Sequence, residues 1–269
     1  CRFYVPDAHS RGSRSAIYYQ DRKVDARTYP ISIDVEQVEA LAEEPQTRLL
    51  RNQLINTISD RKMILRVDRI EPSKNILRGL EAYRELLNNH PEHRGQVQML
   101  ALLVPSRMEV DEYKDYFQQI MAEVGMINAD FFEEYWEPVR AVVGENYSRA
   151  IAAMQLYDVL LVNPVADGMN LVAKEGALVN QRDGVVVLSE YAGVHYELGD
   201  LPLVVSPFDI YGTAEAMHRA LIMPPEERRR RAEALRERVR TADVRDWFRA
   251  QVEDAMRAFN SQVKNASTS

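Results

Sequence analysis

The chain has 269 residues, of which 46% are hydrophobic and 28% are charged, and its formal net charge is −7. These values are ordinary for a globular protein, and the negative charge excludes a general nucleic-acid binder, which needs a basic face. No run of about 18 apolar residues is present to span a membrane, and the single cysteine, Cys1, excludes an internal disulfide. We therefore expect a cytoplasmic protein with neither a membrane nor a nucleic acid as its partner.

The first 30 residues are polar and basic, and their sequence is typical of an internal segment of a longer protein. We expect 1–30 to be a remnant of an N-terminal domain and its connection to the next domain. Residues 29–34 are expected to be extended, and the apolar spacing over 35–59 favours a helix.

From residue 63 onward, short apolar runs alternate with segments of helical spacing. Strands are expected at 63–67, 97–104, 139–143, 159–162, 185–188 and 203–205, and helices at 76–87, 109–124, 148–155 and from about Asn170. This alternation is typical of βαβ units around a parallel sheet. It predicts a Rossmann-like, doubly wound α/β domain over 31–240.

The last part of the chain is helical in pattern. Helices are expected at 214–221, from 224–225 onward, and at 243–259. We expect 241–269 to form a C-terminal crossover helix and a frayed tail.

The loop after the first strand carries two cations, Arg69 and Lys74, five residues apart. Ligands of doubly wound sheets bind outside the carboxyl ends of the strands, and an arginine with a lysine can neutralise a diphosphate there. From this loop alone, two solvated surface cations are the favoured interpretation, because exposed charges of this kind usually contribute little.

The loop after the fourth strand leads into a helix, and residues 167–175 read Asp-Gly-Met-Asn-Leu-Val-Ala-Lys-Glu. Gly168 permits a tight turn, and the start of the helix would point three backbone amides outward, which attracts phosphate. These amides belong to Asn170, Leu171 and Val172. A strand–turn–helix junction without a ligand is the alternative.

Three further positions complete the candidate site. Glu175 lies on the second helical turn, can face the loop that holds Asp167, and can accept hydrogen bonds from sugar hydroxyls. Arg107 is a third cation at a third strand end, within Pro105-Ser106-Arg107. The small residues within 189–193 allow a ligand or a backbone segment to approach closely.

Taken together, these loops resemble those of the trehalose-6-phosphate synthase family. That family carries an Arg-x-Asp-Tyr-x-Lys-Gly loop, for which this chain has Arg69-Ile70-Glu71-Pro72-Ser73-Lys74-Asn75, and a Pro-Ser-Arg loop, matched at 105–107. It also carries the nine-residue run that residues 167–175 match without a gap. The resemblance spans roughly 29–247.

The resemblance implies the C-terminal, donor-binding half of a retaining GT-B glycosyltransferase. Such an enzyme transfers glucose from UDP-, GDP- or ADP-glucose to a sugar phosphate such as glucose 6-phosphate, with no cofactor and no metal. The acceptor-binding N-terminal domain would be missing here, so we expect the isolated chain to be inactive.

The resemblance also implies a role for each candidate residue. The catalytic cations that hold the diphosphate are Arg69 and Lys74. The donor-binding residues are Asp167, Gly168 and Met169 for the hexose, Asn170, Leu171 and Val172 for phosphate, and Glu175 for the ribose. Arg107 corresponds to a cation near the acceptor phosphate.

Four positions depart from the family pattern. Glu71-Pro72 replaces Asp-Tyr, Asn75 replaces Gly, and Ala166 stands where an arginine precedes the Asp-Gly pair. A transferase with another acceptor, a pseudoglycosidic coupling enzyme and a non-catalytic nucleotide-sugar-binding module therefore remain open.

Two histidines, His90 and His93, have a spacing seen in metal sites. Pro91 lies between them and a metal site needs more than two ligands, so the sequence favours a surface turn without a metal.

Overall fold

The computed structural model describes residues 9–10, 16–20, 22–133 and 136–266, so Cys1 and the end of the expected tail lie outside the described residues. Backbone contacts divide the chain into one unit, Ser32–Arg245, and a second unit formed by Cys1–Ile31 with Asp246–Ser269. The assignment of 1–30 to a preceding domain stays a prediction.

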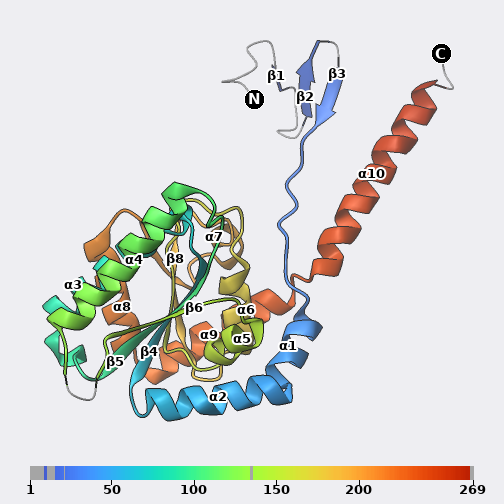
Figure 1. The fold of residues 1–269 in the computed structure, drawn as a ribbon. Coiled ribbons are helices and arrows are strands. Elements are labelled where there is room, and N and C mark those ends of the chain that lie inside the picture. The colour runs from blue at the N-terminus through green and yellow to red at the C-terminus, as the bar shows by residue number, and fades with distance from the viewer. Residues whose placement is uncertain (1–8, 11–15, 21, 134–135, 267–269) are drawn as a thin grey trace. The chain divides into compact units, whose positions relative to one another are not determined.

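The larger unit is built around a six-stranded parallel sheet (Figure 1). Its strands are β4 (Lys62–Arg69), β5 (Val97–Val104), β6 (Val139–Val143), β7 (Val159–Val162), β8 (Val185–Ser189) and β9 (Leu203–Val205). They lie in the order β6-β5-β4-β7-β8-β9, and every pair is parallel. The Rossmann-like, doubly wound sheet predicted from the sequence is therefore confirmed.

Helices cover both faces of this sheet. One face packs against α3 (Ile76–Asn89), α4 (Asp111–Asp130) and α8 (Ile210–Ile222). The other packs against α1 (Val35–Glu43), α2 (Pro45–Ile58), α5 (Tyr147–Met154), α6 (Leu171–Val179) and α9 (Pro225–Arg240). Side chains alternate along each strand, so Ile64 joins the first core while Met63 and Leu65 join the second. Burial on both faces explains the continuous apolar runs of the strands.

The single helix expected over 35–59 is wrong, because the structure has two helices there. Pro45 occupies the first turn of α2. Proline disfavours helical geometry in the residue before it, and Glu44 is extended with ψ 145°. Three short helices were also not expected. They are η1 (Pro72–Lys74), η2 (Pro91–His93) and α7 (His195–Leu198).

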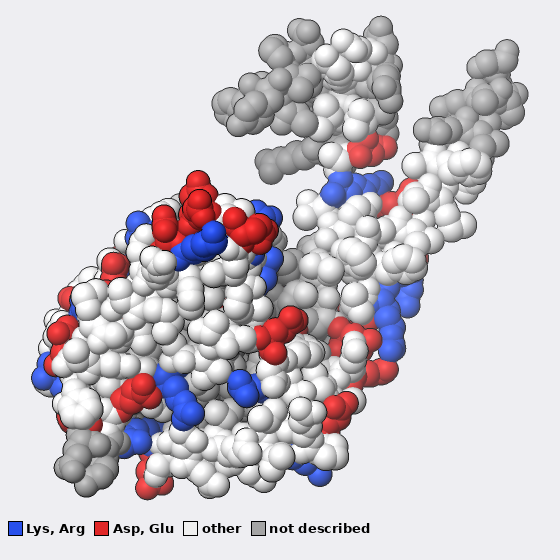
Figure 2. Space-filling view, in the orientation of Figure 1, with Lys and Arg blue, Asp and Glu red and all other residues white. Residues whose placement is uncertain are grey.

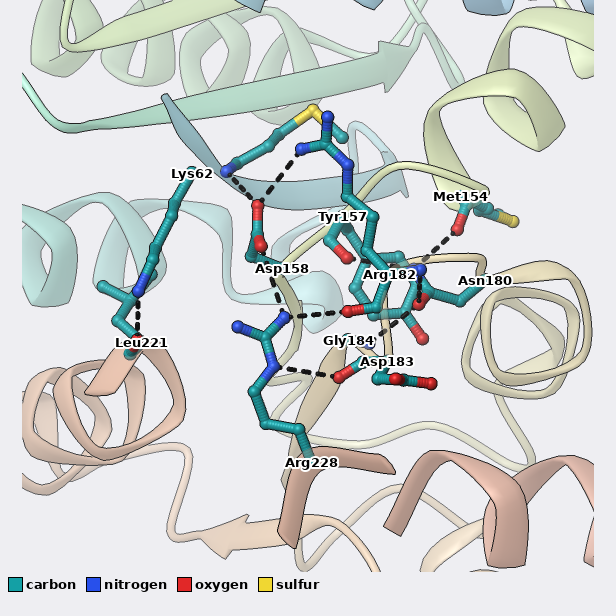
Figure 3. A network of polar contacts seen from close by, with 11 residues as sticks. Lys62, Met154, Tyr157, Asp158, Asn180, Arg182, Asp183, Gly184, Leu221 and Arg228 are labelled. Atoms are coloured by element: carbon teal, nitrogen blue, oxygen red, sulfur yellow. Dashed lines mark hydrogen bonds and ion pairs between the residues drawn. The ribbon is translucent and has the colours of Figure 1, made fainter. Parts of the chain in front are cut away.

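The amino ends of β4 and β7 are joined through Asp158 (Figure 3). Its Oδ2 accepts a hydrogen bond from the Met63 amide at 2.8 Å, and its Oδ1 accepts one from Arg228 Nη2 at 3.2 Å. Lys62 Nζ donates to the Leu221 carbonyl at 2.5 Å. Two of the cations around the cavity of about 700 Å³ at this edge, Lys62 and Arg228, thus hold α8 and α9 to the sheet.

The second unit contains β1 (His9–Ser10), β2 (Ala16–Tyr19) and β3 (Arg22–Asp25), which pair antiparallel, and α10 (Val244–Ala266). Within it, the Tyr29 hydroxyl donates to Asp254 Oδ2 at 2.8 Å, and Trp247 Nε1 donates to the Tyr29 carbonyl at 3.0 Å. None of the helices among the described residues is long and apolar enough to cross a membrane. On the face drawn in Figure 2, acidic and basic side chains are interspersed.

Candidate functional site

The candidate site lies where β4 and β7 pair in the middle of the sheet. The strand order reverses between these two strands, and ligands of doubly wound sheets bind at such a point. The loops that follow the two strands are joined directly. The Val165 amide donates to the Ser73 carbonyl at 2.9 Å, and Asn75 Nδ2 donates to the Asn163 carbonyl at 3.0 Å.

Lys74, in the loop after β4, and Asp167, in the loop after β7, meet at this point. Lys74 Nζ lies 2.6 Å from Asp167 Oδ2, and each side chain is 15% exposed. Asn170 Nδ2 donates to the same oxygen at 3.1 Å. Burial raises the pKa of Asp167, but the hydrogen bonds and charge of its neighbours, Lys74 first, outweigh it and hold the pKa below the ordinary value. Asp167 is therefore a carboxylate at neutral pH.

A buried arginine, Arg66, supports the Lys74 loop from beneath. It is fully buried on β4, and its Nε lies 2.9 Å from Asp68 Oδ2. Its Nη2 donates to the Lys74 carbonyl at 2.5 Å, and its Nη1 donates to Asn163 Oδ1 at 2.8 Å. Burial raises the pKa of Asp68 to about 6, although Arg66 and Lys74 oppose the rise. Sequence reasoning missed Arg66, although a charged residue inside an apolar strand is an available signal.

Asn75, where the related family has glycine, adopts a left-handed backbone conformation with φ 57°. Glycine reaches this conformation without strain, and asparagine is among the side-chain-bearing residues that tolerate it best. Its Nδ2 also donates to the Pro207 carbonyl at 2.7 Å. This departure from the family pattern therefore preserves the turn.

The first turn of α6 presents free backbone amides beside Lys74. Asn170 has φ 76° and caps the helix by accepting a hydrogen bond from the Ala173 amide at 3.0 Å. Among the described residues, the backbone amides of Leu171 and Val172 donate no hydrogen bond. Such amides at a helix N-terminus attract anions.

The loop from Asp167 to Asn170 is clamped by the segment that follows β8. The Gly193 amide donates to the Asp167 carbonyl at 2.9 Å, and the Val194 amide donates to the Met169 carbonyl at 2.8 Å. A Cβ atom on Gly193 would lie 2.0 Å from the Gly168 carbonyl oxygen. The small residues within 189–193 therefore allow a close approach by backbone.

Arg69 lies at the exposed edge of the same region. Its side chain is 60% exposed, and Nη1 lies 2.8 Å from Glu71 Oε1. Ser106 Oγ donates to the same oxygen at 2.9 Å, which links the loops after β4 and β5. Arg107 has φ 48° and donates from Nη1 to the Tyr113 hydroxyl at 3.2 Å. Among the described residues, no hydrogen bond or ion pair joins Arg69 or Arg107 to Asp167.

Glu175 on α6 faces α5. Its Oε1 accepts a hydrogen bond from the Tyr147 hydroxyl at 2.9 Å. Burial raises the pKa of Glu175, and the bond from Tyr147 opposes the rise. Its neighbour Lys174, to which the sequence gave no role, is fully buried and lies 2.6 Å from Glu197 Oε2.

The chain is similar to known proteins over most of its length. The chain is 38% identical over 237 residues to the bifunctional trehalose-6-phosphate synthase/phosphatase of Thermoproteus tenax, covering 86% of this chain and 32% of the relative. It is 35% identical to the trehalose-6-phosphate synthase of Sodalis glossinidius, covering 87% of this chain and 50% of the relative. The chain thus spans half or less of these two relatives.

Solved structures show the same likeness. An α,α-trehalose-phosphate synthase (UDP-forming) from Burkholderia xenovorans, in complex with glucose-6-phosphate, matches with 33% identity and a TM-score of 0.84, over 89% of this chain and 53% of that one. The E. coli structure described as bound with UDP-2-fluoro glucose matches with 29% identity and a TM-score of 0.85, over 92% of this chain and 55% of that one.

These matches confirm the resemblance found in the sequence. The family model described as glycosyltransferase family 20 aligns with residues 4–257, and this match shows that the chain belongs to glycosyltransferase family 20.

Proposed function

We propose that this chain binds the nucleotide-sugar donor in a retaining glucosyltransferase that transfers glucose from UDP-glucose to glucose 6-phosphate. The observation that carries the proposal is the meeting of Lys74, Asp167 and the open first turn of α6 at the carboxyl ends of β4 and β7. Two similar structures support the choice of substrates, since one is in complex with glucose-6-phosphate and the other is bound with UDP-2-fluoro glucose.

The diphosphate of the donor would lie against the amides of Leu171 and Val172. Lys74 would exchange its bond with Asp167 for one with a phosphate oxygen, and the exposed Arg69 would turn to the same group. Negative charge grows on the diphosphate as its bond to the glucose C1 atom breaks, so these two cations stabilise the transition state more than the bound donor.

Transfer with retention places the acceptor on the face of the sugar that the diphosphate leaves. The acceptor hydroxyl oxygen bonds to C1 while the bond from C1 to the phosphate oxygen breaks. The hydroxyl proton passes to the departing diphosphate. In this proposal the chain needs no side chain as nucleophile.

The remaining assignments follow the polarity of each group. Asp167, released from Lys74, and the backbone of Gly168 and Met169 would contact the glucose hydroxyls. Glu175 would accept hydrogen bonds from the ribose, and Arg107 would attract the acceptor phosphate. Segment 1–30 would connect to an acceptor-binding domain, and 241–269 would form the crossover helix.

Calorimetric titration of the chain with UDP-, GDP- and ADP-glucose tests the proposal. Lys74→Met and Arg69→Met should each weaken donor binding by about 1.5–3 kcal/mol, the usual size of a charge-assisted hydrogen bond. Lys114→Met is the matched control, because Lys114 pairs with Asp111 on the exposed start of α4, and its replacement should leave binding unchanged.

Two results would contradict the proposal. One is the failure of all three nucleotide sugars to bind, and the other is an unchanged dissociation constant in both site variants. We expect no glucosyl transfer to glucose 6-phosphate by this chain alone, because it spans half or less of the length of the two relatives; measurable transfer would refute that expectation.

A further inference from the structure

Glu175 lies on α6 without a cation beside it. Among the residues that the structure describes, its side chain takes part in no ion pair, and its one hydrogen bond comes from the Tyr147 hydroxyl, which donates to Oε1 at 2.9 Å. Burial raises the pKa of Glu175, and the bond from Tyr147 opposes the rise. A half-buried carboxylate without a positive partner costs free energy. Its presence beside the open first turn of α6 therefore points to a ligand that completes its hydrogen bonds.

The histidine cluster at η2 differs, because its own members hold it together. His90 Nε2 lies 2.8 Å from Glu215 Oε1, and His93 Nε2 lies 2.9 Å from His218 Nδ1. The rings of His90 and His218 are stacked, with centroids 3.6 Å apart. His93 is only 6% exposed, so its interpretation as part of a surface turn was wrong. The cluster therefore joins η2 to α8 through its own side chains.

Tyr147 is placed to donate to Glu175. It is the first residue of α5 and follows Asn146, which caps the helix by accepting a hydrogen bond from the Arg149 amide at 2.8 Å. Burial and the neighbouring carboxylate raise the pKa of Tyr147 above its usual range, so the hydroxyl keeps its proton at neutral pH. An ionised carboxylate only accepts hydrogen bonds. The bond therefore has one direction, and it fixes Oε1 of Glu175 toward α5.

The position of this pair fits the ribose of a nucleotide sugar. Glu175 follows Leu171 by four residues, so both lie on the same face of α6, and the diphosphate would bind at the amides of Leu171 and Val172. Ribose is bonded directly to that diphosphate. A carboxylate offers about four acceptor positions, of which Tyr147 fills one. Tyr147 is 48% exposed, so a ligand can reach the pair from solvent.

We propose that Tyr147 is a positioning residue of the donor site, which holds the Glu175 carboxylate for the two hydroxyls of the donor ribose. This role rests on the proposed function, since it belongs to the same nucleotide-sugar site. Tyr147 acts through Glu175 and does not touch the reacting atoms. Because two ribose hydroxyls are bound in this way, the site favours ribonucleotide sugars over their 2′-deoxy counterparts.

Calorimetric titration of the full chain with UDP-glucose, 2′-deoxy-UDP-glucose and inorganic pyrophosphate tests this role. Tyr147→Phe keeps the ring and removes only the hydroxyl. We expect the variant to bind UDP-glucose about tenfold more weakly, the order of loss when a hydrogen bond to a charged group is removed. Its preference for UDP-glucose over the 2′-deoxy form should shrink. Pyrophosphate has no ribose and should bind as tightly as to the wild type.

Tyr29→Phe is the matched control. The Tyr29 hydroxyl also donates to a carboxylate, Asp254 Oδ2 at 2.8 Å, but it lies in the second unit of the chain. This variant loses a bond of the same kind outside the donor site. Its affinities for all three compounds should equal those of the wild type.

A pH series gives a readout that a purely structural role would not change. The bond from Tyr147 lowers the pKa of Glu175, so its removal raises that pKa. As the pH falls, UDP-glucose binding should therefore be lost at a higher pH in Tyr147→Phe than in the wild type.

The outcomes separate this role from the proposed function. Failure of the wild type to bind UDP-glucose would overturn both. If the wild type binds it, an unchanged dissociation constant and pH profile in Tyr147→Phe would overturn the role of Tyr147 alone. Equal losses for UDP-glucose and pyrophosphate in that variant would do the same, because they would show a general disturbance of the site.

Discussion

A single methyl group on Gly193 tests how the loop at 167–170 is held. An added Cβ would lie 2.0 Å from the Gly168 carbonyl oxygen and 3.3 Å from Met169 Cα. Ordinary contact begins at 3.4 Å, so the two backbone segments must separate by about 1.4 Å. Backbone atoms cannot turn aside as the end of a flexible side chain can.

This separation would lengthen three backbone hydrogen bonds between the two segments. They run from Asp167 N to Tyr191 O at 3.3 Å, from Gly193 N to Asp167 O at 2.9 Å and from Val194 N to Met169 O at 2.8 Å. Each contributes about 0.5–1.5 kcal/mol, so we expect Gly193→Ala to lower the free energy of unfolding by about 2–4 kcal/mol. Because the loop carries Asp167 and the start of α6, UDP-glucose should bind at least about tenfold more weakly, or about 1.4 kcal/mol.

Urea unfolding followed by circular dichroism measures the first quantity, and calorimetry the second. Gly125→Ala is the matched control, since a Cβ at this position in α4 meets no atom within 4 Å. That variant should be as stable as the wild type or more stable by up to about 1 kcal/mol, because alanine favours helix. If Gly193→Ala matched the wild type in both assays, the clamp would not be what positions the loop.

Three other substitutions probe the supports of the site. Asn75→Ala should cost about 1 kcal/mol more stability than Asn75→Gly in urea unfolding, because both lose the side-chain bonds but only alanine is strained at φ 57°; equal losses would contradict this account. Burial raises the pKa of Asp68 from 3.8 to about 6, so the folded chain binds this proton more tightly than the unfolded chain and loses stability as the carboxyl ionises. Relative to Asp68→Asn, the wild type should therefore lose up to about 3 kcal/mol of its free energy of unfolding between about pH 4 and pH 6.5. A difference between the two proteins in urea unfolding that does not change with pH would refute this prediction. Asp158→Ala should cost about 3–5 kcal/mol, because it removes the carboxylate that pairs with Arg228 and Arg182 and the acceptor of the Met63 amide; a melting temperature equal to that of the wild type would argue against this account.

The sheet was predictable because its strands are short apolar runs buried on both faces. The structure gives β5, β6, β7 and β9 the bounds expected from the sequence. The antiparallel strands of the second unit were not expected, since strands of two to four residues carry too few residues to show a period.

The Lys74–Asp167 meeting was also predictable, because both loops leave carboxyl ends of parallel strands. The residues that support this pair could not be predicted, because their contacts join segments that are distant in the sequence. Arg66 bonds Asn163 across 97 positions, and His93 meets His218 across 125. A local pattern does not contain such pairs.

The pairing of β4 with β7 has a consequence for how the molecule is made. The Met63 amide and the Asp158 carboxylate that join these strands are 95 positions apart, so β4 leaves the ribosome well before its partner. At about 5–20 residues per second, one edge of β4 stays unpaired for about 5–20 seconds during synthesis. An unpaired strand edge of this kind invites pairing with other nascent chains, so aggregation during expression should be most acute in that interval.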